Sequence, residues 1–225
     1  LGTRLSEYTK SIPKPMVKIL GTPIIVHIMK HYFKYGFKKF YVAAGYKQKV
    51  LKDYFKKKKF KWNVKIFDTG EKTMTGGRLK RISKYINNET FCFTYGDGVA
   101  DVNITELISF HKKNNSKATL TAVQPPGRFG SLEFERGKVL SFQEKPKGDG
   151  NWINGGFFVL EPEVFDYIEG DQSVWEQYPL KKLAENGELA AYHHNGFWQP
   201  MDTLKDKMYL DQLWKDSKSP WKCWS

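Results

Sequence analysis

Short apolar runs alternate with segments of helical periodicity between residues 23 and 123, and this alternation restricts the fold more than any other feature of the sequence. In Pro23–Tyr35 the apolar residues recur at helical spacing, whereas Lys39–Ala44 is a short apolar run of strand character. Alternation at this spacing is typical of a parallel sheet wrapped by helices. The expected helices are 23–35, 48–57, 77–86 and 104–113, and the expected strands are 39–44, 64–67, 91–95 and 118–123.

The sequence changes character after Pro125-Pro126, where turn residues separate shorter apolar runs. Two runs that flank Arg136-Gly137 predict a hairpin. The further expected elements are hairpin strands at 131–135 and 138–142, a strand at 153–160, and helices at 175–186 and 203–215. Because the sequence has no internal repeat and no linker, we expect one domain over residues 1–225, in which the second half extends the sheet of the first.

Charge and composition exclude several classes of protein. The formal net charge is +13, and much of the excess lies between Lys56 and Lys61. We interpret this run as a solvated surface loop, and since no nucleic-acid-binding motif accompanies its lysines we expect no nucleic-acid partner. No run of 18 apolar residues exists, so we expect no membrane span. Cys92 and Cys223 form no disulfide or metal pattern, which fits a reducing, cytoplasmic compartment.

Two aspartates are placed where a metal ion could be held. Asp97 closes an apolar strand between two glycines, a position that suits Mg²⁺ but also an ordinary turn. Asp202 precedes the last expected helix and is open to interpretation as the N-cap of that helix. Two aspartates at the ends of elements in an α/β fold could share one metal, which would be completed by substrate phosphates. We expect His193-His194, in a strand-like run, to be structural.

Several cationic groups are candidates for phosphate binding. Lys14 lies between two prolines that stiffen the chain, and Lys145 follows an apolar strand in Glu-Lys-Pro. Residues 75–78, Thr-Gly-Gly-Arg, open a helix, where free amides and an arginine favour an anion or a base edge, although simple capping remains an alternative. Gly2-Thr3-Arg4 combines close backbone approach, a hydroxyl and a cation, as in a phosphate-binding loop.

Taken together, these stretches resemble the sugar-1-phosphate nucleotidyltransferases. Within that family they are most similar to the cytidylyl branch that acts on glucose 1-phosphate, the glucose-1-phosphate cytidylyltransferases or CDP-glucose pyrophosphorylases. The resemblance covers essentially the whole chain. It rests on LGTRLSE (1–7), PKPMVKI (13–19), MTGGRLKRI (74–82), FTYGDGVAD (93–101), PPGRFGSLEF (125–134), EKPKGDG and INGGFFVLEP (144–162), and GFWQPMDTLKDK (196–207).

The resemblance implies a Rossmann-like α/β fold, with a mixed, mostly parallel sheet flanked by helices. It implies transfer of a cytidylyl group from CTP to α-D-glucose 1-phosphate, giving CDP-glucose and pyrophosphate for polysaccharide and deoxysugar biosynthesis, with Mg²⁺ as cofactor in a homo-oligomer. The nucleotide would be bound by residues 1–125. Residues 126–225 would bind the sugar phosphate and supply the C-terminal helix.

The resemblance also implies roles for individual residues. Asp97 and Asp202 would hold Mg²⁺. Gly2, Thr3 and Arg4 would contact the triphosphate, Arg4 would stabilise the leaving pyrophosphate, and Lys14 would bridge the phosphates at the reacting centre. Thr73 and Arg78 would lie on the cytidine side, with Gly96 close to the nucleotide. The sugar phosphate would be bordered by Gly130, Glu144, Lys145 and Gly156.

Three departures from the family pattern leave alternatives open. The family has an apolar strand and two glycines before the position of Leu1, so we expect this chain to lack the first strand. The first lysine of the family's Lys-Pro-Lys-Pro is Ile12 here, and the stretch around Lys56–Trp62 is shorter. The alternatives are a catalytically idle nucleotide-sugar binding module and a family member that uses dTTP, UTP or GTP. A metal-dependent glycosyltransferase of similar topology is a further alternative, but it would require an Asp-x-Asp pair, which Asp97-Gly98-Val99 does not supply.

Overall fold

The structure is a computed structural model that describes residues 5–125, 127, 130–144 and 151–224. In the first half the elements are α1 Ser6–Thr9, η1 Lys14–Met16, β1 Lys18–Ile19, β2 Thr22–Pro23, α2 Ile24–Lys34, β3 Lys39–Ala44, α3 Gln48–Lys57, β4 Asn63–Asp68, α4 Thr75–Ile82, η2 Ser83–Tyr85, β5 Phe91–Thr94, β6 Gly98–Ala100, α5 Ile104–Asn114 and β7 Ala118–Val123. In the second half they are β8 Ser131–Glu135, β9 Lys138–Gln143, β10 Ile153–Leu160, η4 Pro162–Tyr167, α6 Tyr178–Glu185, β11 Leu189–His194, β12 Trp198–Pro200 and α7 Leu204–Lys215.

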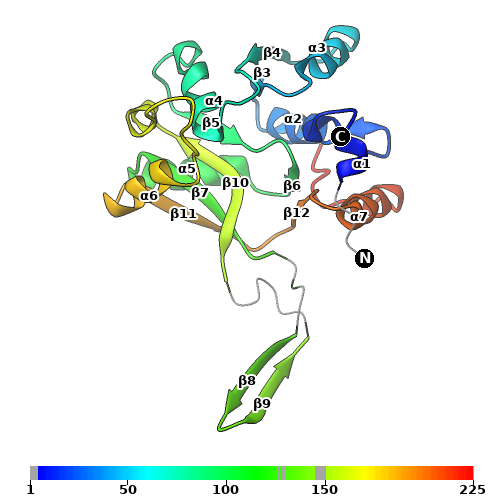
Figure 1. The fold of residues 1–225 in the computed structure, drawn as a ribbon, viewed down its shortest axis with the longest axis vertical. Helices are drawn as coiled ribbons and strands as arrows, with labels where there is room; N and C mark the ends of the chain where they lie inside the picture. Colours follow the sequence, from blue (N-terminus) through cyan, green and yellow to red (C-terminus); the bar gives the residue numbers. More distant parts are fainter. Residues whose placement is uncertain (1–4, 126, 128–129, 145–150, 225) are drawn as a thin grey trace.

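The main sheet has the strand order β11-β7-β10-β5 (Figure 1). Strand β11 runs parallel to β7, and β10 runs antiparallel to both β7 and β5. Strands β5, β7 and β11 therefore share one direction, and β10 is inserted between them in the opposite direction. Helix α5 packs against β7, β10 and β11, while α3 and α4 pack against the separate parallel pair β3-β4. The predicted mixed α/β fold is confirmed.

A cavity of about 460 Å³ lies between β3 and β5. Among the described strands, β3 pairs with β4 alone and β5 pairs with β10 alone, so each has an unpaired edge. Residues of both strands line the cavity, and the four residues of β5 are only half-buried although three of them are apolar. The expected buried strand 91–95 thus has one edge without a neighbouring strand.

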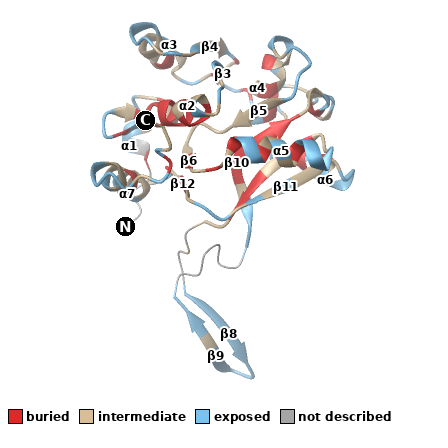
Figure 2. Cartoon of the chain, turned by 180° about the vertical axis from the view of Figure 1, so that it is seen from behind, coloured by how far each residue is buried: buried red, intermediate tan, exposed pale blue. Residues whose placement is uncertain are grey.

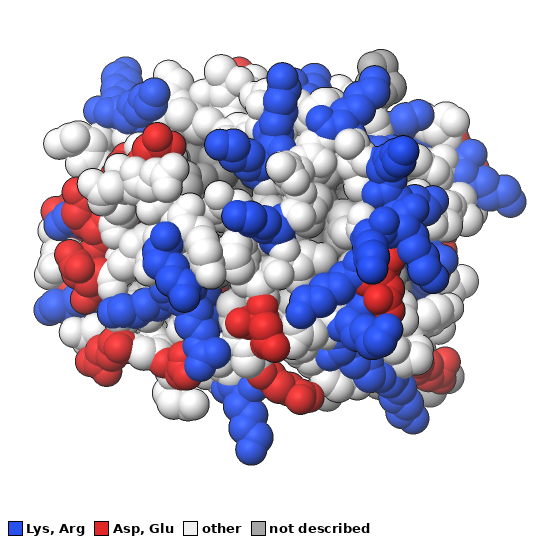
Figure 3. All heavy atoms as spheres, turned by 90° about the horizontal axis from the view of Figure 1, so that it is seen from above, with Lys and Arg blue, Asp and Glu red and all other residues white. Residues whose placement is uncertain are grey.

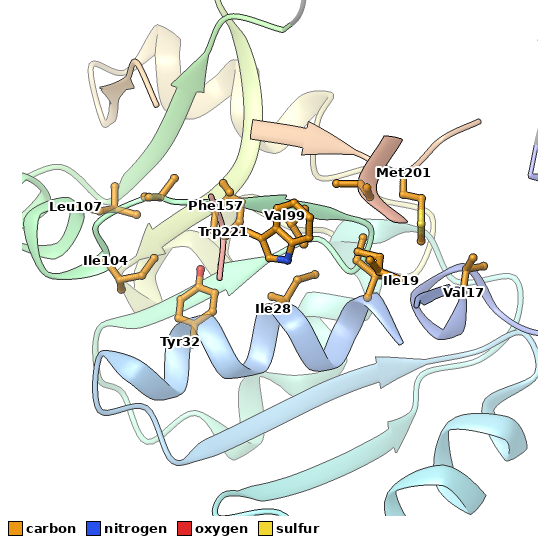
Figure 4. Close-up of a cluster of buried hydrophobic side chains, with 14 of the residues drawn as sticks. Val17, Ile19, Ile28, Tyr32, Val99, Ile104, Leu107, Phe157, Met201 and Trp221 are labelled. Carbon is orange, nitrogen blue, oxygen red and sulfur yellow. The ribbon is translucent and has the colours of Figure 1, made fainter. Parts of the chain in front are cut away.

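The largest apolar cluster is built around α2 (Figure 4). Ile24, Ile28 and Tyr32 recur every four residues along this helix, so they lie on one face and all three are buried. Figure 4 shows Ile28 and Tyr32 pointing from α2 toward Trp221 and Phe157, while Val17 and Met201 lie at the far end of the cluster. The core therefore joins the segment of Lys14, the β6 region and the C-terminal region of the chain.

Several boundaries differ from those expected from the sequence. Helix α6 begins at Tyr178 rather than at residue 175, because Pro179 lacks a backbone donor and is tolerated only in the first turn of a helix. The amphipathic segment 77–86 is helical only from Thr75 to Ile82 and continues as a 3-10 turn. The three-residue strands β6 and β12 were not expected, since so short a run carries no readable periodicity.

The predicted hairpin is present as β8-β9 and stands away from the body of the molecule (Figures 1 and 2). Its turn is formed by Arg136 at φ 47° and Gly137 at φ 79°, as a two-residue hairpin turn requires. Figure 2 shows the hairpin almost entirely exposed, in contrast with the buried strands of the main sheet.

The surface is strongly basic on the face shown in Figure 3, where lysine and arginine side chains outnumber acidic ones. Lys56–Lys59, at the end of α3 and just after it, are exposed, as expected for a solvated run. Cations at the C-terminal end of a helix also interact favourably with its dipole. None of the helices in the described ranges is both long enough and apolar enough to cross a membrane.

Candidate active site

The short strands β6 and β12 bring Asp97 and Asp202 together. They pair antiparallel, with Pro200 opposite Gly98, so the residues just before β6 lie beside those just after β12. The backbone amide of Met201 donates to the carbonyl oxygen of Asp97 at 2.8 Å, which continues this ladder by one bond. The two carboxylates are thus fixed by backbone pairing between segments that lie far apart in the sequence.

The ammonium group of Lys14 lies between these two carboxylates. Its Nζ is 2.8 Å from Oδ2 of Asp97 and 2.5 Å from Oδ1 of Asp202. Burial alone would lower the pKa of Lys14, but the charge of Asp97 and the hydrogen bonds to Asp202 and Asp97 outweigh it and raise that pKa. All three side chains keep some contact with solvent, at 32%, 35% and 51% exposure for Lys14, Asp97 and Asp202. The arrangement is an open site with two anionic groups around one cation.

The backbone on both sides of this cation is tightly packed. Lys14 opens the 3-10 turn η1 between Pro13 and Pro15, whose rings fix the local φ angles. A Cβ atom on Gly96 would lie 2.9 Å from Cγ of Pro15, so only glycine lets the Asp97 turn approach the Lys14 turn this closely. Gly96 therefore has a packing role that the sequence did not reveal.

Asp202 is not the N-cap of helix α7, so the alternative interpretation of this residue is wrong. The cap is Thr203, whose hydroxyl accepts from the amide of Asp206 at 3.1 Å, while Oδ2 of Asp206 accepts from the amide of Thr203 at 2.8 Å. The same Oδ2 atom accepts from the amide of Asp202 at 3.1 Å. The side chain of Asp202 is left to face Lys14. The spacing Thr-x-x-Asp is the signal that could have identified this cap.

Asp101 organises the chain that enters β12. Its Oδ1 accepts from the amide of Phe197 at 2.7 Å and lies 2.9 Å from Nε2 of His194. Burial by itself would raise the pKa of Asp101, but the contacts with His194 and Phe197 lower it below its ordinary value. His194 lies at the end of β11, so the expected structural role of this histidine agrees with its contacts.

Thr73 and Arg78 lie close to the carboxyl ends of β3 and β4. The guanidinium of Arg78 donates to the hydroxyl of Thr69 at 2.7 Å and to the carbonyl of Glu71 at 3.1 Å. A Cβ on Gly45 would lie 2.5 Å from Nη1 of Arg78, and Thr73 is buried. Ligands in open α/β sheets bind at this end of the strands, so the position suits the predicted base-side role.

At the start of α4 the amide of Gly77 and the hydroxyl of Thr75 are already engaged within the protein. The amide of Gly77 donates to the carbonyl of Ser173 at 3.1 Å, and the hydroxyl of Thr75 is engaged by Glu176 and by the amide of Trp175. Both glycines pack on backbone atoms of residues 171–173, where a Cβ would come within 2.7 Å. The glycines of this motif therefore serve close packing, and the anion interpretation is wrong for the amide of Gly77.

The other predicted residues are divided between two places. Gly156, at φ 78°, packs against the ring of Tyr95, next to the Gly96-Asp97 turn. Gly130 and Glu144 lie at the two ends of the hairpin, and a Cβ on Gly130 would be 3.6 Å from Oε2 of Glu144. Gly2, Thr3, Arg4 and Lys145 lie outside the described residues.

Comparison with known proteins decides the family. A family model described as Nucleotidyl transferase matches residues 1–216. The chain belongs to the nucleotidyl transferase family. Glucose-1-phosphate cytidylyltransferase of Salmonella typhi is 54% identical over 247 residues, covering 100% of this chain and 96% of that protein. The probable glucose-1-phosphate cytidylyltransferase of Bacillus subtilis is 41% identical, covering 99% and 96%.

Two solved structures share the fold of this chain. HddC from Yersinia pseudotuberculosis matches with a TM-score of 0.77 at 25% identity, covering 95% of each chain. UDP-glucose pyrophosphorylase complexed with UDP-glucose matches with a TM-score of 0.72 at 16% identity, covering 93% of each chain. At the latter identity the likeness concerns the fold alone.

The two carboxylates of this nucleotidyltransferase fit a divalent cation. They already converge on one positive charge, the Lys14 ammonium, and carboxylate oxygens are the ligands that Mg²⁺ prefers. Within the described ranges, no group of three or more His, Cys, Asp or Glu side chains is placed to bind a metal. A magnesium ion here would therefore use one or two carboxylates and complete its shell with phosphate oxygens and water.

Proposed function

We propose that this chain transfers a cytidylyl group from CTP to α-D-glucose 1-phosphate, giving CDP-glucose and pyrophosphate. The observation that carries the reaction class is the convergence of Asp97 and Asp202 on a single cation. The choice of nucleotide and sugar is supported by the 54% identity, over the whole chain, to a glucose-1-phosphate cytidylyltransferase.

In the proposed reaction an oxygen of the sugar phosphate attacks the α-phosphorus of CTP. The new phosphorus–oxygen bond forms in line with the bond that breaks, and the electron pair of that bond leaves with pyrophosphate. The chain contributes positioning and charge neutralisation. Lys14 meets the charge that builds between the entering and leaving phosphates, Arg4 meets the charge on the pyrophosphate, and Gly2 and Thr3 hold the triphosphate.

Asp97 and Asp202 would hold Mg²⁺, which when bound neutralises negative charge on the phosphates. We assign the nucleotide to residues 1–125, where Thr73 and Arg78 flank the base and Gly96 lies close to the nucleotide. We assign the sugar phosphate to residues 126–225, beside Gly130, Glu144, Lys145 and Gly156. Asp97 comes from the first of these segments and Asp202 from the second, so the site joins the two. The nucleotide substrate and the free thiols of Cys92 and Cys223 support a cytoplasmic location.

Nucleotide preference tests this proposal. Pyrophosphate release should be measured with glucose 1-phosphate, magnesium and each of CTP, dTTP, UTP and GTP, and CTP should give the highest kcat/KM. A tenfold preference for dTTP, about 1.4 kcal/mol in transition-state free energy, would contradict the cytidylyl assignment. Binding of CDP-glucose without pyrophosphate release from any nucleotide would instead indicate an idle binding module.

We further propose that the enzyme is a homo-oligomer in which the β8-β9 hairpin is covered by a second copy. Leu132 and Phe142 are opposite one another across the hairpin, as are Phe134 and Val139. The exposed fractions of the large apolar residues are 52% for Leu132, 74% for Phe134, 58% for Val139, 65% for Leu140 and 62% for Phe142. An isolated two-stranded hairpin is at best marginally stable in water, and an exposed apolar patch of this kind marks an interaction site.

The oligomeric state can be measured by light scattering coupled to size exclusion. We expect the wild-type chain to elute as an oligomer and Phe134→Ser/Phe142→Ser to shift toward the monomer. Glu133→Ser/Glu135→Ser changes the same hairpin at polar positions and serves as the matched control. A monomeric wild-type protein at micromolar concentration would refute this assembly.

A further inference from the structure

Lys14 occupies the place between the carboxylates that a divalent cation would take. Its Nζ lies 2.8 Å from one carboxylate oxygen and 2.5 Å from the other. Magnesium binds oxygen at about 2.0–2.1 Å and requires near-octahedral geometry. An ammonium group bound to both oxygens would therefore crowd and repel an ion that binds the same pair.

The surrounding structure allows the Lys14 side chain to move while its backbone stays fixed. Pro13 and Pro15 restrain the turn, and Pro15 is packed against Gly96. The side chain itself remains 32% exposed, and Asp202 is 51% exposed, so the open side of the site faces solvent. A flexible lysine stem on a rigid turn can exchange one set of anionic partners for another.

We propose that Lys14 is an internal competitor for the divalent cation, whose ammonium holds Asp97 and Asp202 together until phosphate groups draw it away. Metal binding and triphosphate binding are then coupled through this one side chain. The coupling must be reciprocal: a triphosphate raises the affinity for the metal by the factor by which the metal raises the affinity for the triphosphate. This inference rests on the proposed function for its phosphate ligand, but the competition itself involves only groups of this chain.

Charge explains why the resting site binds metal weakly. With Lys14 in place, two carboxylates and one ammonium leave one net negative charge in the site. When the ammonium turns toward a bound triphosphate, both carboxylates are released for the ion, and the phosphate oxygens become available to complete its shell. The metal and the triphosphate therefore favour one another, and neither alone forms the complete site.

Equilibrium binding of Mn²⁺ to the full chain without nucleotide tests the competition. Mn²⁺ prefers the same oxygen ligands as Mg²⁺, and its free form is counted directly by electron paramagnetic resonance. We expect Lys14→Met to bind Mn²⁺ at least tenfold more tightly than the wild type. Lys14→Arg keeps a cation at the site and should remain as weak as the wild type. Lys18→Met, at an exposed position of β1, removes the same unit of charge and should change the affinity less than threefold.

A second series with inorganic tripolyphosphate tests the coupling. Tripolyphosphate should tighten Mn²⁺ binding in both proteins, and the factor should be at least ten times larger in the wild type than in Lys14→Met. The Mn²⁺ affinities are first corrected for the Mn²⁺–tripolyphosphate complex that forms in solution. Mn²⁺ binding by Lys14→Met that is no tighter than in the wild type overturns the proposal. Equal enhancement in both proteins overturns it as well.

The experiments distinguish the competitor role of Lys14 from the proposed cytidylyl transfer. If the Mn²⁺ series fails while pyrophosphate release from CTP is normal, the competitor role is wrong and the proposed reaction stands. If no variant binds Mn²⁺ with or without tripolyphosphate, the metal-holding role of Asp97 and Asp202 fails together with the competition. Thermal melting of each variant confirms that the compared proteins are folded.

Discussion

Asp206 accepts a hydrogen bond from the backbone amide of Asp202 at 3.1 Å, so the cap of helix α7 also fixes the backbone of a candidate site residue. The carboxylate of Asp206 takes two further hydrogen bonds from Thr203, one from the amide and one from the hydroxyl, both at 2.8 Å. The side-chain amide of Gln199 in β12 donates to it at 3.1 Å. One side chain thus connects the helix, the strand and Asp202.

Asp206 is therefore expected to be a positioning residue. Asp206→Ala and Thr203→Ala both remove the capping interaction and should each lower the free energy of unfolding by about 1 kcal/mol. Asp206→Ala also frees the backbone of Asp202, and a displacement of about 1 Å at a reacting centre can reduce turnover by up to a hundredfold. We expect kcat to fall at least tenfold more in Asp206→Ala than in Thr203→Ala. Equal kcat values in steady-state assays of the two variants would show that the cap alone matters.

Asp97→Asn and Asp202→Asn should each reduce turnover by roughly a hundredfold or more, because metal-supported stabilisation of the transition state contributes several kcal/mol. Both substitutions keep the size of the side chain, so melting temperatures should change little. Asp166→Asn, at an exposed position of η4, is the matched control and should retain activity. Near-normal turnover in Asp202→Asn would remove this residue from the proposed metal site.

Two buried histidines should make the enzyme sensitive to mild acid. Burial, assisted by Lys30, lowers the pKa of His27 from 6.5 to about 4, and burial likewise lowers that of His31 to about 4. Between these values the unfolded chain binds more protons than the folded chain, so stability is full above about pH 6.5 and is lost as the pH falls toward 4. Each histidine contributes on the order of 3 kcal/mol over this window.

His27→Phe tests this pH dependence. Nε2 of His27 has no hydrogen-bond partner among the described residues, and Nδ1 accepts only a long hydrogen bond of 3.4 Å from the indole of Trp221. Loss of that bond lowers stability equally at both pH values, so the difference between them still reports the titration of His27. Urea unfolding at pH 7.5 and at pH 5 should show that the variant loses about half as much stability between the two pH values as the wild type. The same loss in both proteins would mean that other groups dominate the acid sensitivity.

The cavity between β3 and β5 should accept an additional strand. An apolar segment of six residues fused ahead of Leu1 would pair the unpaired backbone groups of both strands and cover the half-buried β5 residues. A gain of about 2 kcal/mol corresponds to an increase in Tm of roughly 4–8 °C for a chain of this size. The control is the same extension with a central proline, which removes a ladder donor. Identical melting curves for the two extensions would argue against strand addition.

Helices and strands were predicted best where the element is long enough to show a clear periodicity of apolar residues. Helix α3 begins and ends at the expected residues, and strand β3 does as well. The strands β6 and β12 were missed because three residues carry no period, yet their pairing is what joins Asp97 to Asp202. The amide of Gly77 was interpreted wrongly because its partner, the carbonyl of Ser173, is brought there only by tertiary packing.

The candidate site was partly accessible to sequence reasoning. The suggestion that Asp97 and Asp202 share a cation agrees with their convergence on Lys14, while their role as metal ligands stays a prediction. The position of Pro15 against Gly96 and the contact of Asp206 with Asp202 depend on the three-dimensional arrangement. Periodicity reports which face of an element is buried, and it carries no information on which side chains meet across elements.

The assembly of the site from residues 14, 97 and 202 has a consequence for biosynthesis. While the ribosome is still making the chain, Lys14 and Asp97 emerge well before their third member, and β6 has no partner until β12 follows it out of the exit tunnel. A nascent or prematurely terminated polypeptide that stops before residue 202 therefore lacks part of the candidate site, even if most of its sheet is in place. The cluster of Lys14, Asp97 and Asp202 can therefore form only after the C-terminal segment has docked.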